Sequence, residues 1–273
     1  MSELKYEESF KNEVVDYFLN NQHLSCRKLA SIFNISKDMA LKWMKPYIEP
    51  KTLKKFDREY FKEINSEEKA YWLGFSYADG YVSFLRNGGA YELALCEEDK
   101  SHLEKFIKCL NAEHTLKRKE IKLKGYDKIH IAYRLNLCDY GFAKDLERRG
   151  CIERKSLTKT FPTEEQCPSK YIRYFLRGYF DGNGNISFHN NSLSIGIDSS
   201  EYFLKGFTEF CMKNILDIGE EFNYRQVKDK NGWRCSKSGS KALNILDYLY
   251  EDSNIHLDRK YKKYLEIKKI KGI

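Results

Sequence analysis

The chain has 273 residues, of which 41% are hydrophobic and 15% aromatic, so it holds apolar material for two or three compact units and is not disordered along its length. No apolar run approaches the roughly 20 residues of a membrane span, and the charged N-terminus lacks a signal-peptide core, so we expect a cytoplasmic, nucleoid-associated protein that is neither secreted nor in a membrane. Lys and Arg number 48 against 40 Asp and Glu, a formal charge of +8 that suits a polyanionic partner such as a nucleic acid.

Residues 1–50 form the first predicted unit, a small all-helical domain. Apolar residues at helical spacing mark a helix near residues 10–18, and Ser25 and Ser36 are expected to cap two further helices across a tight turn. This pattern resembles a helix-turn-helix, in which Ser36, Lys37 and Lys42 would face a DNA major groove. A helical packing or protein-interaction domain is the alternative. Residues 51–65 are expected to be a charged linker.

The remainder of the chain contains an internal repeat. The segment 72–84 (WLGFSYADGYVSF) recurs as 176–188 (LRGYFDGNGNISF), which sets Asp79 opposite Asn183, 104 residues apart. A second landmark, an Arg-Lys pair at 154–155 and again at 259–260, recurs after 105 residues. Two landmarks at nearly the same offset indicate a duplicated domain.

Both repeats have the same predicted order of elements: helix, hairpin, helix, strand pair, helix. The hairpin strands are expected at 81–85 and 91–95 in the first repeat, and at 185–188 and 192–197 in the second. The final helices are expected at 140–148 and 240–250. The sequence therefore predicts an α+β fold with two pseudo-symmetric αββαββα domains, residues 66–159 and 170–273, joined by a linker at 160–169.

Small residues spaced four apart mark one face of the first helix of each repeat. Gly74 and Ala78 share this face in the first helix, and Gly178 and Gly182 share it in the second. Such spacing lets two helix backbones approach closely. Packing of the two helices on this face would bring their C-terminal ends together. Each of these ends carries a polar residue, Asp79 in the first and Asn183 in the second.

The segments 73–80 and 176–184 resemble the two motifs of a monomeric LAGLIDADG homing endonuclease, and the resemblance extends over about residues 66–265. It implies a β-saddle on a long, asymmetric double-stranded DNA site that is cut in both strands by a monomer. It also implies Mg²⁺, or Mn²⁺ in its place, between the motif helices, and a role in intron homing. The implied catalytic and metal-binding residues are Asp79 and Asn183.

Asn183 departs from the family pattern, which has an acid there. Asn offers a carbonyl oxygen but no negative charge. Three explanations stay open: a deliberate Asp→Asn substitution, a natural strand-biased or degenerate nuclease, or replacement of the ligand by Asp181, whose position on the helix suits a structural hydrogen bond better. Tyr77 stands where the motif usually has its first Asp, which is not the metal ligand.

Further site residues are implied by position in the repeat or by location on predicted strands. Those implied to order water near the metal, each equally well an ordinary phosphate contact, are Glu98, Arg134, Asn136, Ser199, Arg234 and Lys237. Those expected to contact DNA are Ser83, Arg86, Lys117, Arg118, Arg225 and Lys228. Arg259 and Lys260 would serve the fold or a phosphate. The eight cysteines have no zinc or disulfide spacing and are expected to be small buried hydrophobic residues.

Two functions of other classes fit the same sequence. One is a DNA-binding regulator that retains the saddle but has lost catalysis, which Asn183 and the helix-turn-helix pattern favour. The other is an RNA maturase that assists splicing of a group I intron. Metal-dependent nicking would eliminate the first, and preference for structured RNA over duplex DNA would support the second.

Overall fold

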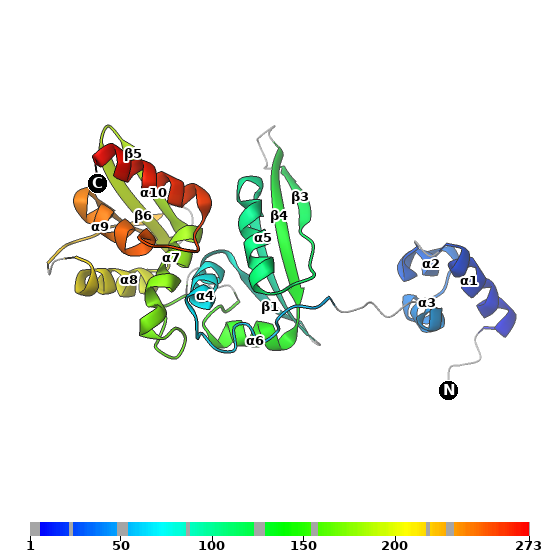
Figure 1. Cartoon of the computed structure of the whole chain (residues 1–273). Coiled ribbons are helices and arrows are strands. Elements are labelled where there is room, and N and C mark those ends of the chain that lie inside the picture. Colours follow the sequence, from blue (N-terminus) through cyan, green and yellow to red (C-terminus); the bar gives the residue numbers. More distant parts are fainter. Residues whose placement is uncertain are drawn as a thin grey trace. The chain divides into compact units, whose positions relative to one another are not determined.

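The computed structural model describes residues 6–21, 24–47, 54–85, 88–122, 129–153, 158–216, 219–227 and 232–272. The chain divides into two compact units, Met1–Leu53 and Lys54–Ile273, which we call the N-terminal unit and the body. The N-terminal unit is helical, and the body contains two sheets with their own helices (Figure 1).

The elements of the N-terminal unit are α1 (Glu8–Asn20), α2 (Cys26–Ile32), α3 (Lys37–Met44) and the 3₁₀ turn η1 (Lys45–Tyr47). As predicted, Ser25 and Ser36 cap α2 and α3, because their hydroxyl oxygens accept the backbone N–H of Lys28 and Met39. Asn34, between the two helices, has a φ of 50°, a left-handed conformation that Asn adopts more readily than most residues. The three helices bury a core of their own, made of Val14, Val15, Phe18, Leu29, Ala30, Ile35, Ala40, Trp43 and Met44.

The body confirms the predicted repeat of αββαββα units. The first copy comprises α4 (Glu67–Asp79), β1 (Tyr81–Leu85), β2 (Gly88–Cys96), the 3₁₀ turn η2 (Glu97–Asp99), α5 (Lys100–Cys109), β3 (Lys117–Lys122), β4 (Ile129–Cys138) and α6 (Tyr140–Arg148). The second comprises η4 (Ser169–Tyr171), α7 (Ile172–Asn183), β5 (Gly184–His189), β6 (Ser192–Ser199), α8 (Glu201–Asn214), β7 (Asn223–Val227), β8 (Gly232–Ser238) and α9 (Gly239–Tyr250). A further helix, α10 (Asp258–Lys271), follows. No described helix is long and apolar enough to cross a membrane.

Each copy forms a four-stranded antiparallel sheet. Sheet A has the order β1-β2-β4-β3, and sheet B has the order β5-β6-β8-β7. In sheet A, Tyr91, Leu93 and Leu95 of β2 are buried against α5 and α6. Because successive side chains of a strand point to opposite faces, Glu92 and Ala94 lie on the other face of the sheet, which we call its open face.

Sheet B repeats this arrangement. Leu193, Ile195 and Ile197 of β6 are buried against α8 and α9, so Ser194 and Asp198 lie on the open face of this sheet. Figure 1 shows the helices gathered against each sheet.

Residues 54–65 differ from the expected linker. Phe56, Tyr60, Phe61 and Ile64 are buried and belong to the core of the body, and Lys55 and Asp57 form backbone hydrogen bonds with the segment after α5. This stretch is rich in charged residues, but its four apolar side chains pack into the core of the body. The boundary between the two units accordingly lies at residue 53.

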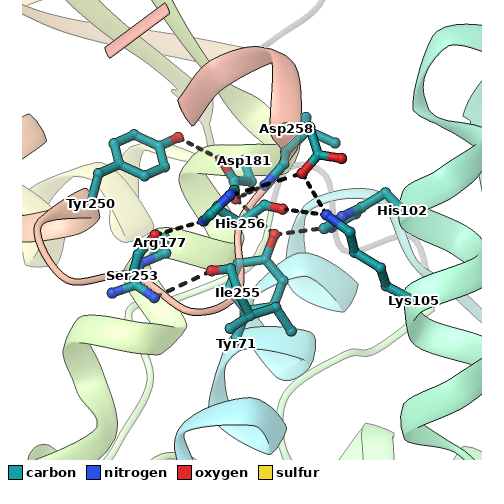
Figure 2. Close-up of polar contacts among 11 residues, drawn as sticks. Tyr71, His102, Lys105, Arg177, Asp181, Tyr250, Ser253, Ile255, His256 and Asp258 are labelled. Atoms are coloured by element: carbon teal, nitrogen blue, oxygen red, sulfur yellow. Dashed lines mark hydrogen bonds and ion pairs between the residues drawn. The ribbon is translucent and has the colours of Figure 1, made fainter. Parts of the chain in front are cut away.

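Buried hydrogen bonds join the two copies (Figure 2). The Tyr71 hydroxyl of α4 donates to Asp181 Oδ2 of α7 over 2.7 Å and lies 2.9 Å from His102 Nε2 of α5. Tyr250 Oη and the Leu257 N–H also donate to the Asp181 carboxylate, at 2.5 and 2.8 Å. The fold thus depends on polar contacts between copies as well as on apolar packing.

We expect the body to lose stability as the pH falls below about 6.5, the ordinary pKa of histidine. Burial lowers the pKa of His102 to about 3, and the charge of Lys105 adds to this effect. The unfolded chain therefore binds one more proton between these pH values, which costs up to about 1.4 kcal/mol of stability for each pH unit. Urea unfolding of the full chain at pH 7.5, 6 and 5 measures this slope. His102→Gln should flatten it, and an unchanged slope in that variant would contradict the assignment.

Candidate active site and nucleic-acid interface

The paired helices α4 and α7 form the centre of the body, and glycines set their close approach. A Cβ atom added to Gly74 would lie 1.9 Å from the carbonyl oxygen of Phe175, and one added to Gly178 would lie 2.0 Å from that of Tyr71. Both distances are far below van der Waals contact, so only glycine fits at these two positions. Phe175 and Tyr71 are equivalent residues of the two copies, so the helix pair has the pseudo-twofold packing that the motif spacing predicts.

The same packing brings the two helix ends together. A Cβ atom on Gly182 would lie 2.2 Å from the Ala78 side chain and 3.0 Å from Asp79 Oδ2. The Asp79 carboxylate at the end of α4 is therefore placed beside the end of α7, at Gly182, the residue before Asn183. Asp79 is exposed and Asn183 is half-buried. Each helix is followed at once by the first strand of its sheet, at Tyr81 in β1 and Gly184 in β5.

The two helix ends differ in their chemistry. Asn183 Nδ2 donates to the hydroxyl of Tyr179 over 3.2 Å, and that hydroxyl donates to Ser199 Oγ over 2.6 Å. With its amide N–H group turned to Tyr179, Asn183 keeps its carbonyl oxygen as the acceptor for a ligand. The residue equivalent to Tyr179 in the first copy is Phe75, which has no hydroxyl. The second half of the site is thus built around an amide, and the first around a carboxylate.

Asp181 does not replace the missing carboxylate. Its side chain is only 1% exposed, and its two oxygens accept three hydrogen bonds from Tyr71, Tyr250 and the Leu257 backbone. Burial raises its pKa, an effect that the Lys260 charge opposes. Its equivalent in the first copy, Tyr77, is also buried and donates to the Arg149 carbonyl over 2.7 Å. The side chains at these two motif positions therefore form structural hydrogen bonds that stabilise the fold.

Two buried lysines bind the C-terminal ends of the motif helices. Lys260 Nζ donates to the carbonyl oxygens of Phe180 and Asp181, each over 2.7 Å, and to that of Gly184. Lys159 Nζ donates to the Tyr77 carbonyl over 3.0 Å. A cation at this end of a helix stabilises the unpaired carbonyl groups. Burial lowers the pKa of both lysines to about 8, and the charge of Asp79 opposes the change.

Sequence reasoning missed Lys159. The Arg-Lys repeat points to Lys155 as the counterpart of Lys260, but residues 154–157 lie outside the described part of the chain. Lys159 forms the equivalent contact with α4, although its distance from Lys260 does not match the repeat offset. Arg259 Nε lies 3.0 Å from both carboxylate oxygens of Asp99 in the first copy. Of the two roles expected for Arg259, this contact fits the structural one.

The donor set fits one divalent cation better than two. No group of three or more His, Cys, Asp or Glu side chains in the described residues is placed to hold a metal ion. Mg²⁺ in nucleic-acid enzymes commonly uses one or two carboxylates and takes its other ligands from phosphates and water. The Asp79 carboxylate and the Asn183 carbonyl oxygen suit a single ion of this kind. They do not suit two ions that each need a carboxylate.

The open faces of both sheets carry a basic pair at the same position of the ladder. Lys117 of β3 is in register with Arg134 of β4, and Arg225 of β7 is in register with Arg234 of β8. Each central arginine is also held by an acid: Arg134 Nη1 lies 2.9 Å from Glu92 Oε2, and Arg234 binds both oxygens of Asp198, at 2.5 and 2.6 Å. This equivalence was not visible in the linear sequence.

Other predicted site residues lie elsewhere. Ser83 and Asn136 are on the open face of sheet A, in register with Ala90 and Glu92. Glu98 lies in the exposed turn η2, beside Gly184 and Arg259.

Three predicted site residues have side chains on the helix-covered side of a sheet, because side chains alternate along a strand. Ser199 and Lys237 are buried on the helix-covered face of sheet B, where Lys237 Nζ binds Glu220 Oε2 at 2.6 Å. Arg118 is in register with Tyr133 on the covered side of sheet A and pairs with Glu120. Arg86 and Lys228 lie outside the described residues.

The cysteines also depart in part from expectation. Cys151, Cys167, Cys211 and Cys235 are buried, whereas Cys96 and Cys138 are exposed at the ends of β2 and β4. In the N-terminal unit, Ser36, Lys37 and Lys42 are exposed at the start and along one face of α3. The Ser36 hydroxyl already serves as the helix cap.

Comparison with known proteins finds similarity only among solved structures. No family model and no curated protein sequence matches the chain. The homing endonuclease I-WcaI bound to its DNA recognition sequence has a TM-score of 0.49 and 15% identity, over 78% of this chain and 90% of that one. The I-LtrWI LAGLIDADG homing endonuclease bound to target DNA has a TM-score of 0.45 and 14% identity, over 78% and 90%. For the meganuclease I-SmaMI bound to uncleaveable DNA the values are 0.46 and 13%, over 75% and 90%. These structural neighbours are homing endonucleases, and I-LtrWI and I-SmaMI are of the LAGLIDADG type.

Proposed function

We propose that the body is a site-specific endonuclease for double-stranded DNA whose active site has a carboxylate in only one of its two halves. The observation that carries the proposal is the meeting of the α4 and α7 ends, which sets the Asp79 carboxylate against Gly182, the residue before Asn183. The helix ends lead directly into two sheets whose open faces carry matched basic pairs. Basic groups at regular positions suit the phosphates of a duplex.

The proposed metal is Mg²⁺, with Mn²⁺ as a substitute, bound by Asp79 and by the carbonyl oxygen of Asn183. Such an ion activates a water molecule and stabilises the leaving oxygen of a phosphodiester. Tyr179 and Ser199 fix the direction of the Asn183 amide. Lys159 and Lys260 bind the carbonyl groups at the two helix ends, and they bring positive charge to a region that must accept a phosphate.

On the DNA, we assign phosphate and base contacts to the open faces, with Ser83, Lys117, Arg134 and Asn136 on sheet A and Arg225 and Arg234 on sheet B. A single chain supplies both halves of the helix pair, so the enzyme would act as a monomer. The N-terminal unit would add a second DNA contact through Lys37 and Lys42 of α3. Intron homing is the biological role that such an enzyme would serve.

The chain with Asn183 is expected to nick DNA, and Asn183→Asp is expected to cut both strands. The added carboxylate would complete the second half of the site. Supercoiled plasmids that carry a randomised insert report both reactions, because a nick gives the open circle and a double-strand break gives the linear form. Mg²⁺ is the metal, and EDTA provides the blank.

The same assay separates the proposal from its rivals. Specific binding to duplex DNA without metal-dependent cleavage by either form would establish the regulator, which Asn183 favours. Tighter binding to a structured group I intron RNA than to any selected duplex would establish the maturase. Either result overturns the nuclease assignment.

A further inference from the structure

We propose that the two sheets read part of their half-sites by different chemistry: sheet A contacts C5 methyl groups of thymine at its Ala90–Cys138 rung, and sheet B forms hydroxyl hydrogen bonds at the equivalent Ser194–Ser238 rung. The inference rests on the proposed function and adds the base chemistry of the target. It comes from a comparison of equivalent rungs, which are pairs of residues facing each other across the two central strands.

The ladder gives an unambiguous correspondence between the two open faces. Ala94 faces Arg134 in sheet A, and Asp198 faces Arg234 in sheet B, so these rungs are equivalent. The rung four residues earlier on β2 and β6 is Ala90–Cys138 in sheet A and Ser194–Ser238 in sheet B. The rung between them is Glu92–Asn136 in sheet A and Gly196–Ser236 in sheet B.

Two of the three equivalent rungs differ in chemistry, whereas the middle rung is polar in sheet A, with Glu92 and Asn136, and holds Gly196 and Ser236 in sheet B. Sheet A presents methyl and thiol groups at Ala90, Ala94 and Cys138, and Ala94 and Cys138 are exposed. Tyr81 on the neighbouring strand β1 is 54% exposed on the same face. Sheet B presents hydroxyl groups where sheet A has Ala90 and Cys138, and a carboxylate where it has Ala94.

These residues discriminate between bases in different ways. The thymine methyl is the apolar group of the major groove, and alanine side chains contact it well. A serine hydroxyl can donate or accept, so it suits several bases and gains nothing from a methyl group. Because both sheets keep the same basic pair, phosphate contacts would be equal in the two halves and the difference would lie in base readout.

The test uses deoxyuridine, which pairs as thymine does but lacks the methyl group. A duplex selected from a random library by the full chain is made with deoxyuridine for thymine in one half, in the other half, or in neither. For the wild-type chain we expect Kd to rise about 4-fold for each contacted methyl in one half, the equivalent of about 0.8 kcal/mol. The other half should show less than about a 2-fold change.

Two exposed-face variants assign the sensitive half to a sheet. Ala90→Ser with Cys138→Ser gives sheet A the serine rung of sheet B and should remove the penalty. The matched control, Ser194→Ala with Ser238→Ala, should leave that penalty unchanged. Equal penalties in both halves, a penalty that survives the sheet A change, or one that the control removes would overturn the inference alone. If the library yields no bound duplex, the proposed function fails, and the inference with it.

Discussion

Asp79→Asn is expected to abolish DNA cleavage while leaving DNA binding intact. The substitution keeps the shape of the side chain and removes the exposed carboxylate at the end of α4. A bound metal stabilises the transition-state charge by several kcal/mol, and each 1.36 kcal/mol is a factor of ten in rate. The nicking rate should therefore fall by on the order of 10³-fold or more. Single-turnover cleavage of the selected duplex measures the rate, and gel shift in Ca²⁺ measures the binding.

A matched control separates loss of the carboxylate from a general effect of the substitution. Asp252→Asn makes the same change at an exposed turn after α9, where the φ of 54° suits Asn as well as Asp. It should cleave at the wild-type rate. If Asp79→Asn cleaves as fast as this control, Asp79 is not the metal ligand and the assignment of the site is wrong.

The second large effect is expected for Gly74→Ala in the helix pair. The new Cβ would lie 1.9 Å from the Phe175 carbonyl oxygen, a backbone atom that cannot move without displacing α7. Alanine favours a helix over glycine by about 1 kcal/mol, but overpacking of a tight interface costs roughly 1–3 kcal/mol and occasionally more. The steric cost should win here, because the overlap involves backbone on both sides. We expect a net loss of about 2 kcal/mol or more from the stability of the body.

Calorimetric unfolding of the full chain tests this expectation, since the N-terminal unit has its own core and should keep its transition. Gly178→Ala should cause a loss of similar size, because its Cβ would lie 2.0 Å from the Tyr71 carbonyl oxygen. Gly88→Ala is the control: its Cβ would have no atom within 4 Å, so the stability should change little. A Gly74→Ala protein that unfolds at the wild-type temperature would show that the two helices are not packed as described.

The sequence by itself was enough for the features that depend on local pattern and on repetition. The caps at Ser25 and Ser36, the strands after each motif and the final helix of each repeat follow from neighbouring residues, and they were predicted at or near their observed positions. The close approach of α4 and α7 could also be predicted, because small residues spaced four apart on a helix let two helix backbones come into contact. Asp79 and the departure at Asn183 follow from aligning two copies of one motif.

Tertiary structure decided which side chains meet. Phe56 and Tyr60 lie in a segment rich in charged residues, yet both are buried because their side chains pack against the core of the body. Ser199 and Lys237 are polar residues on strands, and only the ladder register shows that their side chains point under the helices. Lys159 is far from its helix partner in sequence, so its contact with the Tyr77 carbonyl depends on how the chain returns to α4. Contacts between residues far apart in the chain, such as those between the two copies, are set by long-range packing, which no local pattern of residues encodes.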